Sequence, residues 1–248
     1  MDDTLAVVLA AGLGTRMKSD LPKVLIPVLG RPMIEYVLDA LAAAGIKRTI
    51  VIVGHRADDV KRLLAGRPGI EFAVQAERKG TGHAAKMAQP LLVGHKGPVA
   101  IVAGDSPLLQ GSSLRKLLEH FNVNKSACLL GTLFKPNPRG LGRILRDVDR
   151  NFLGIVEERD ATAGQKLITE VNMSTYVFAG PELVHALDQL KNDNEQGEYY
   201  LTDCPGLLRS EGKLVEALPI LQPCEALSIN TPDELKQVEA EMRRLGYS

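Results

Sequence analysis

Short apolar runs without polar alternation recur along the chain, and segments with apolar residues three or four positions apart separate them. The runs are typical of strands buried on both faces of a sheet, and the spaced segments predict amphipathic helices. Alternation of the two predicts an open α/β sheet of parallel strands. The predicted strands are 5–10, 49–54, 71–75, 99–104 and 127–133, and the predicted helices are 31–46, 58–66, 81–92 and 112–121.

The second half of the chain is less regular. Residues 143–158 predict a hairpin with a polar turn at 149–151, a strand follows over 170–180, and the pattern over 181–190 predicts a helix. The predicted fold class is therefore α/β, a Rossmann-like, open, mostly parallel mixed sheet flanked by helices.

Two predicted helices carry end signals. Pro32 suits the first turn of its helix, and Gly45 suits the C-terminal cap. At the last helix, Thr231 as N-cap, Pro232 at the first position and Glu234 three residues after the cap form a capping box. We expect that helix to close the chain and to hold the residues before it rigidly.

Composition narrows the function classes. Thirty basic and thirty acidic residues balance, only 4% of the 248 residues are aromatic and tryptophan is absent. A broad nucleic-acid or membrane-surface field is not expected from this balance. The three cysteines are odd in number and lack paired spacing, which favours reduced thiols. With neither a leader pattern nor an apolar run that spans a bilayer, we expect a cytoplasmic protein without membrane partners.

The segment VVLAAGLGTRMKSDLPKVL, residues 7–25, follows the first predicted strand. Its small residues let backbone amides approach an anion. The dinucleotide fingerprint requires a third glycine after Gly12 and Gly14, where this chain has Met17. A Walker loop requires Gly-Lys-Ser/Thr, which the segment lacks. The two glycines alone also fit an ordinary tight turn.

Cations near this loop favour anion binding. Arg16 lies where amides would face an anion, and Lys23 follows Pro22 in a stretch that proline biases toward extended backbone. From there Lys23 can fold back over the glycine loop. Lys18 is closer to an ordinary solvated side chain.

These residues carry a resemblance. LAAGLGTRM followed by PK, residues 9–23, resembles the signature loop of the sugar-1-phosphate nucleotidyltransferases, most closely the uridylyltransferase domain of bacterial N-acetylglucosamine-1-phosphate uridylyltransferases. The resemblance covers nearly the whole chain in order. Its further motifs are QAERKGTGHA (75–84), GDSPLL (104–109), GLGRI (140–144), GIVEERDAT (154–162), EVN (170–172), QGEYYLTD (196–203) and IN (229–230).

The resemblance implies the nucleotide-diphospho-sugar transferase fold and a magnesium-dependent reaction. UMP would pass from UTP to N-acetylglucosamine 1-phosphate, giving UDP-N-acetylglucosamine, a cell-wall precursor, and pyrophosphate. The attacking phosphate is already an anion, because its second pKa is about 6, so a general base is not required. We expect one domain over 1–248, with a nucleotide half at roughly 1–110, a sugar-phosphate half at 111–230 and a closing helix at 231–248.

The resemblance also implies the nucleotide site. Gln75 can present a donor and an acceptor to a uracil edge, although a polar residue at a strand end is the plainer interpretation of a lone glutamine. Arg16 would face the β and γ phosphates, and Lys23 would lie at the α-phosphate and the attacking phosphate. The implied nucleotide-binding residues are Leu9, Ala10, Ala11, Gly12, Gln75, Gly80, Thr81, Gly104 and Asp105.

The resemblance also implies which residues bind the metal and the sugar. Asp105 comes directly after a buried strand, and with Asn230 it would hold Mg²⁺. The plainer alternatives are an N-cap or Asx-turn for Asp105 and an Asx-turn for Asn230. The implied sugar-binding residues are Gly142, Glu157, Asn172 and Asn230. For Glu157 the alternative is a charged strand end on a solvated hairpin.

The chain departs from the family pattern at four positions. The family usually has tyrosine at Ala103, G-Y-G-R where this chain has Leu141, and N-T-G where it has Met173 and Ser174. We expect all four to lie near the sugar. They bear on the identity of the sugar more than on the nucleotide or the reaction. The nearest alternative is the same reaction with another sugar 1-phosphate or another pyrimidine nucleotide.

Two further classes remain as alternatives, a regulator that binds nucleotide without turnover and a guanylyltransferase for a cofactor phosphate. The first could dispense with Lys23, Asp105 or Asn230, and the second does not explain QGEYYLTD. The hexapeptide repeats that bifunctional relatives carry are absent up to Ser248, so we expect no acetyl transfer from acetyl-CoA. The oligomeric state does not follow from the sequence.

Overall fold

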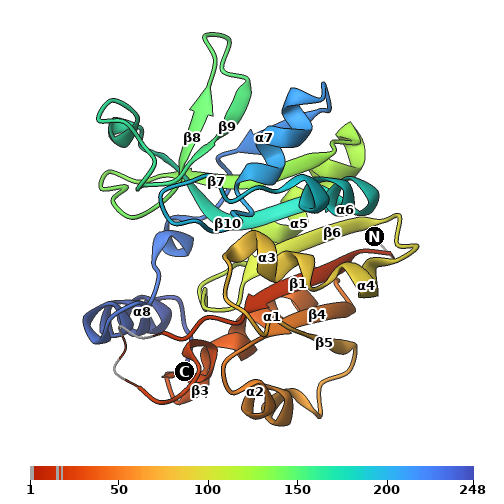
Figure 1. Cartoon of the computed structure of the whole chain (residues 1–248). Helices are drawn as coiled ribbons and strands as arrows, with labels where there is room; N and C mark the ends of the chain where they lie inside the picture. Colours follow the sequence, from red (N-terminus) through yellow and green to blue (C-terminus); the bar gives the residue numbers. More distant parts are fainter. Residues whose placement is uncertain (1–2, 15–16, 18) are drawn as a thin grey trace.

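The computed structural model describes residues 3–14, 17 and 19–248 (Figure 1). Nine strands of this part of the chain form one sheet: β1 (Leu5–Ala10), β4 (Arg48–Val53), β5 (Ile70–Val74), β6 (Pro98–Ala103), β7 (Cys128–Phe134), β8 (Arg143–Arg146), β9 (Phe152–Val156), β10 (Glu170–Ala179) and β11 (Val215–Leu218). Their order is β11-β7-β10-β6-β1-β4-β5, with β8 paired to β10 and to β9.

The pairing confirms the predicted mostly parallel mixed sheet. β1 pairs in parallel with β4 and β6, β4 with β5, and β7 with β11. β10 lies antiparallel between β6 and β7. The β8–β9 hairpin was predicted with its polar turn, and Figure 1 shows it projecting from the sheet.

Helices cover both faces of the sheet. One face packs against α1 (Met33–Ala43), α2 (Ala57–Leu64) and α5 (Gly111–Asn124). The other packs against α3 (Thr81–Lys86), α4 (Gln89–Leu92), α6 (Gly180–Gln189) and α7 (Asp203–Ser210). Alternate residues of β1 enter the two cores, which explains why its sequence has no polar position.

Local chemistry moves several predicted boundaries. The helix predicted over 81–92 is two helices, because Pro90 lacks the N–H that would continue the first one. Pro32 is the N-cap rather than a helical residue; it belongs to β3 (Arg31–Pro32), which pairs with β2 (Pro27–Val28). Gly45 follows the helix with φ 88°, as its predicted capping role requires.

The last helix, α8 (Pro232–Arg244), fixes the residue before its cap. Thr231 Oγ1 accepts from the backbone N–H of Glu234 at 3.3 Å, and the Glu234 carboxylate accepts from the backbone N–H of Asn230 at 2.7 Å. Val238 and Met242 bury the helix against β2 and the start of α1. Asn230 is therefore held rigidly, as predicted.

Short 3-10 turns are η2 (Lys23–Leu25), η3 (Gln165–Leu167) and η4 (Pro223–Ala226).

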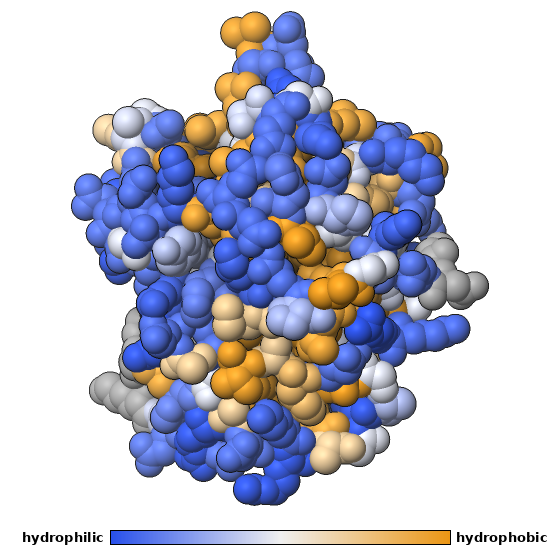
Figure 2. Space-filling view, turned by 45° about the vertical axis from the view of Figure 1, so that its right-hand side comes forward, coloured by the Kyte–Doolittle hydropathy of each residue, from blue (hydrophilic) through white to orange (hydrophobic). Residues whose placement is uncertain are grey.

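Polar side chains cover most of the face drawn in Figure 2, and apolar side chains gather toward its middle. Over the described ranges, none of the helices is long and apolar enough to cross a membrane.

Candidate active site

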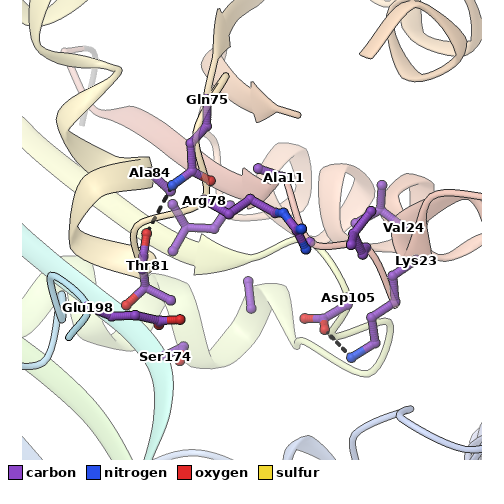
Figure 3. A pocket seen from close by; sticks show the side chains of 15 residues that line it. Ala11, Lys23, Val24, Gln75, Arg78, Thr81, Ala84, Asp105, Ser174 and Glu198 are labelled. Carbon is purple, nitrogen blue, oxygen red and sulfur yellow. Dashed lines mark hydrogen bonds and ion pairs between the residues drawn. The ribbon is translucent and has the colours of Figure 1, made fainter. Parts of the chain in front are cut away.

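A cavity of about 430 Å³ opens at the carboxyl ends of β1, β5 and β6 (Figure 3). Open α/β sheets place their ligands at this edge. The side chains drawn there come from segments far apart in the sequence. The cavity is lined by Leu9, Ala11, Gly12, Leu13, Lys23, Val24, Gln75, Arg78, Gly80, Thr81, Ala84, Ala103, Asp105, Ser174 and Glu198.

Lys23 joins two predicted metal ligands at one end of the cavity. Its Nζ lies 2.5 Å from Asp105 Oδ2 and 2.9 Å from Asn230 Oδ1. Asp105 lies two residues beyond β6, and Asn230 immediately precedes the capped helix α8. Three residues separated by up to 207 positions thus meet at one point.

The glycine loop folds against Lys23, as predicted. Gly14 has φ 67°, and a Cβ added there would lie 2.7 Å from the Cβ of Lys23. The local backbone of Lys23 differs from the prediction of an extended stretch. Pro22 is extended, but Lys23 is the first residue of the 3-10 turn η2. At Gly12 an added Cβ would meet nothing within 4 Å, so this backbone faces open space.

The oxygens around Lys23 suit a hard divalent cation. A carboxylate and an amide oxygen converge within hydrogen-bonding distance of one positive charge, and Mg²⁺ prefers such oxygen ligands. Within the described residues, histidine, cysteine and acidic side chains do not gather in a group of three that could hold a metal. With two oxygen-bearing side chains at this point, phosphates and water would complete the coordination of a divalent cation bound here.

Gln75 closes the opposite end of the cavity. Its side chain is only 5% exposed, and its Nε2 lies 3.0 Å from the carbonyl of Gly80 and 3.0 Å from His83 Nδ1. Thr81 Oγ1 accepts from the backbone N–H of Leu201 at 3.1 Å. The QAERKGTGHA segment is thereby packed against QGEYYLTD, which explains why these distant motifs occur together.

The backbone around the first strand fits closely. The N–H of Gly104 donates to the Leu9 carbonyl at 2.9 Å, and a Cβ added at Gly104 would lie 3.0 Å from that oxygen. Ala10 points into the core and is 3% exposed, so only its backbone is available to a ligand. Arg16, predicted as a catalytic residue, lies outside the described residues.

Three predicted sugar-binding residues form a second cluster. The backbone N–H of Asn172 donates to the Gly142 carbonyl at 2.9 Å, and a Cβ added at Gly142 would lie 3.6 Å from Glu157 Oε1. Glu157 accepts from Thr202 Oγ1 at 3.0 Å, and burial raises the pKa of its carboxyl. Asn230, the fourth predicted member, lies instead with Lys23.

Comparison with known proteins decides the family. A model described as the MobA-like NTP transferase domain matches residues 6–202. The chain belongs to this family. It is a nucleotidyltransferase, as the sequence predicted.

Curated relatives extend the similarity over the whole chain. The bifunctional protein GlmU of Exiguobacterium sibiricum is 44% identical over 96% of this chain, and that of Shouchella clausii is 42% identical over 98%. The bifunctional protein GlmU of Streptococcus suis is 43% identical over 98%. The chain spans about half the length of these relatives, 53% in each case.

A solved structure shares the fold. UDP-glucose pyrophosphorylase complexed with UDP-glucose superposes with a TM-score of 0.78, covering 98% of this chain and 99% of that chain. Sequence identity is 16%, so this similarity concerns the fold. It confirms the predicted nucleotide-diphospho-sugar transferase architecture.

Two charged residues that line the cavity of this nucleotidyltransferase were not predicted. Arg78 and Glu198 both line it, although each lies within a motif that the sequence analysis singled out. Figure 3 shows the Arg78 side chain extending across the cavity from the Gln75 side. Charged residues in a loop have no periodicity, so the sequence offered no signal that they face inward.

The four departures from the family pattern do not share one place. Ala103 and Ser174 line the cavity, as expected of residues near a substrate. Leu141 and Met173 instead pack against the apolar core beneath. That all four lie near the sugar stays a prediction, because Leu141 and Met173 are only partly buried and adjoin Gly142 and Asn172 of the sugar cluster.

Ser174 carries backbone strain where the family pattern has glycine. Its φ is 53°, within an irregular stretch of β10 between Asn172 and Tyr176. A Cβ is disfavoured in this left-handed conformation. We expect Ser174→Gly to raise the free energy of unfolding by about 0.5–1 kcal/mol, or a few degrees in Tm. Ser174→Ala is the control because it keeps the Cβ, and an equal gain in both variants would contradict the strain.

A buried carboxyl beside the sugar cluster predicts a pH effect. Burial, with Glu157 and Asp160 nearby, raises the pKa of Asp203 from 3.8 to about 6. The folded protein then binds this proton more tightly than the unfolded chain does. Protonation of Asp203 therefore makes its full contribution to the free energy of unfolding below pH 4, and this contribution is lost as pH rises through 6.

Asp203→Asn should remove the loss of stability that the wild type shows as pH rises through 6. Between pH 4.5 and 7.5, Tm should fall less in the variant than in the wild type, by a few degrees for about 1 kcal/mol. Asp193→Asn is the control, because Asp193 is an exposed carboxylate that lines the same small surface cavity as Asp203 and Glu157. If the difference in Tm between the wild type and the variant stays constant with pH, Asp203 is not protonated in the folded state.

Proposed function

We propose that the chain transfers UMP from UTP to N-acetylglucosamine 1-phosphate, giving UDP-N-acetylglucosamine and pyrophosphate. The observation that carries this proposal is the meeting of Lys23, Asp105 and Asn230 at one end of a cavity that Gln75 closes at the other. Similarity to GlmU over nearly the whole chain supports it.

Each part of the substrates has a place in this proposal. The nucleobase lies at Gln75, Gly80 and Thr81, and the phosphates lie along the backbone of 9–12 toward Lys23. The sugar lies toward Gly142, Glu157 and Asn172, where a carboxylate and an amide can bond hydroxyl groups. One domain carries both halves of the site, the nucleotide in 1–110 and the sugar phosphate in 111–230.

The chemistry requires alignment and charge neutralisation. A phosphate oxygen of the sugar 1-phosphate attacks the α-phosphorus, a new P–O bond forms, and the bond to the bridging oxygen of pyrophosphate breaks with its electron pair leaving on pyrophosphate. Lys23 holds the attacking and α phosphates together and stabilises the charge that accumulates there. Mg²⁺, held by Asp105 and Asn230, would supply further neutralisation of phosphate charge.

Two alternatives to this function are a different sugar 1-phosphate as the substrate and a regulator that binds nucleotide without turnover. A different sugar 1-phosphate is favoured by Ala103, which lines the cavity where the family pattern has a large aromatic residue. A regulator without turnover would not need Asp105 and Asn230 each within 3 Å of the Lys23 Nζ. The buried, free cysteines Cys128, Cys204 and Cys224 support the cytoplasmic location that we propose.

Substrate panels test the proposal. With UTP fixed, kcat/KM is measured for the 1-phosphates of N-acetylglucosamine, glucosamine, glucose and N-acetylgalactosamine, and then for other nucleotides with the best sugar. We expect a sharp preference for UTP and a looser preference among sugars, since one lost contact at Ala103 is worth roughly ten- to two-hundred-fold. A sharp preference for N-acetylglucosamine 1-phosphate would defeat the role given to Ala103, and absence of turnover with UTP would defeat the proposed function.

A further inference from the structure

The orientation of the Gln75 amide depends on two neighbouring groups, the carbonyl of Gly80 and the ring of His83. The Gln75 Nε2 carries two hydrogens, and two partners lie at 3.0 Å: the Gly80 carbonyl and His83 Nδ1. In Figure 3 the amide nitrogen points toward the loop that carries Thr81, and the oxygen lies on the side of Ala11. With both hydrogens engaged, the amide presents only an acceptor to the nucleobase.

His83 can accept a hydrogen bond only while its ring is neutral. Burial and the nearby Lys79 lower the pKa of His83, which favours the neutral ring. A neutral imidazole has one donor and one acceptor nitrogen. Because the Gln75 Nε2 can only donate, the His83 Nδ1 at 3.0 Å is the acceptor of this bond.

From this geometry we infer that His83 is a positioning residue for nucleobase specificity, fixing the Gln75 amide so that its oxygen faces the base. Uracil presents an N3–H donor at the position where cytosine presents an acceptor nitrogen. An acceptor-only Gln75 bonds the first and opposes the second. The inference rests on the proposed function, because it assumes that the cavity holds a pyrimidine nucleotide.

Equilibrium binding separates this inference from catalysis. Dissociation constants for UTP and for CTP are measured with the full chain without sugar phosphate, for the wild type and for His83→Phe, His83→Asn and His120→Phe. Phenylalanine keeps a ring but removes the acceptor, whereas the asparagine Oδ1 can replace Nδ1. His120 bonds Glu216 on the α5 face and serves as the control.

We expect the wild-type preference for UTP over CTP to fall at least about tenfold in His83→Phe, the effect of losing one hydrogen bond. It should return to within about threefold of wild type in His83→Asn and stay unchanged in His120→Phe. An unchanged preference in His83→Phe, or an equal loss in both His83 variants, would overturn the inference. If His83→Phe does not fold, the asparagine variant decides the matter, because loss of preference there contradicts an acceptor role.

The failure of the proposed function would look different. A wild-type chain that binds UTP in preference to CTP but releases no pyrophosphate with any sugar 1-phosphate would defeat the proposed reaction and leave the positioning role intact. A wild-type chain that binds UTP and CTP equally would overturn the positioning role, whatever its turnover.

Discussion

Lys23→Met should lower kcat at least roughly a hundredfold, while the dissociation constant for UTP changes much less. The ammonium lies where the attacking and α phosphates would meet, and it acts most strongly as charge builds up in the transition state. Methionine is preferred to alanine because the lysine stem packs against Gly14, so the substitution removes the charge and keeps the contact. Single-turnover rates and UTP binding by calorimetry separate the two effects.

A matched lysine gives the control for this experiment. Lys213 pairs with Glu182 at 2.8 Å on the surface near α6 and α7, so Lys213→Met also removes one partner of an ion pair. It should leave kcat unchanged. Equal turnover in Lys23→Met and the wild type would return Lys23 to an ordinary loop side chain and remove the central support of the mechanism.

Asp105→Asn should raise the magnesium concentration that gives half-maximal rate about tenfold or more. Affinity of oxygen sites for divalent cations depends on the number of charged ligands, and this substitution removes the one carboxylate of the pair. Asn230→Ala should act in the same direction because it deletes the amide oxygen. Since both residues are partly exposed, Tm should change little.

Asp39→Asn is the matched control for the carboxylate. Asp39 pairs with Arg31 and Arg67 away from the cavity. Its loss should lower Tm and leave the magnesium dependence unchanged. The same pattern at Asp105, a lower Tm with an unchanged magnesium requirement, would identify that residue as a structural cap.

Much of the fold could be predicted because its strands are buried on both faces. Runs such as 5–10 and 99–104 have no polar position, and the helices between them are amphipathic, so pattern alone identifies both. β11 and α7 were not predicted. β11 has four residues at the edge of the sheet, and α7 contains Pro205 and Gly206, which weaken a helical pattern. The insertion of β10 between β6 and β7 depends on contacts that sequence periodicity does not record.

The site was predictable as a set of residues but not as a geometry. The resemblance placed Asp105 and Asn230 together on a metal and Lys23 at the phosphates, whereas the ion pair between Lys23 and Asp105 spans 82 positions and depends on the fold. The bond between Gln75 and His83 was also missed, since a histidine early in a short helix is an ordinary feature of sequence. Arg78 lines the cavity from a loop whose direction is set by the packing of 80–82 on 199–201.

The central claim is transfer of a nucleotidyl group to a sugar phosphate, and product analysis tests it most directly. The full chain is incubated with UTP, N-acetylglucosamine 1-phosphate and Mg²⁺, and pyrophosphate and UDP-N-acetylglucosamine are quantified together by mass spectrometry. We predict equal amounts of the two products, with neither formed when the sugar phosphate is omitted. Pyrophosphate without a UDP-sugar, or UTP left intact with every sugar 1-phosphate of the panel, would contradict the account.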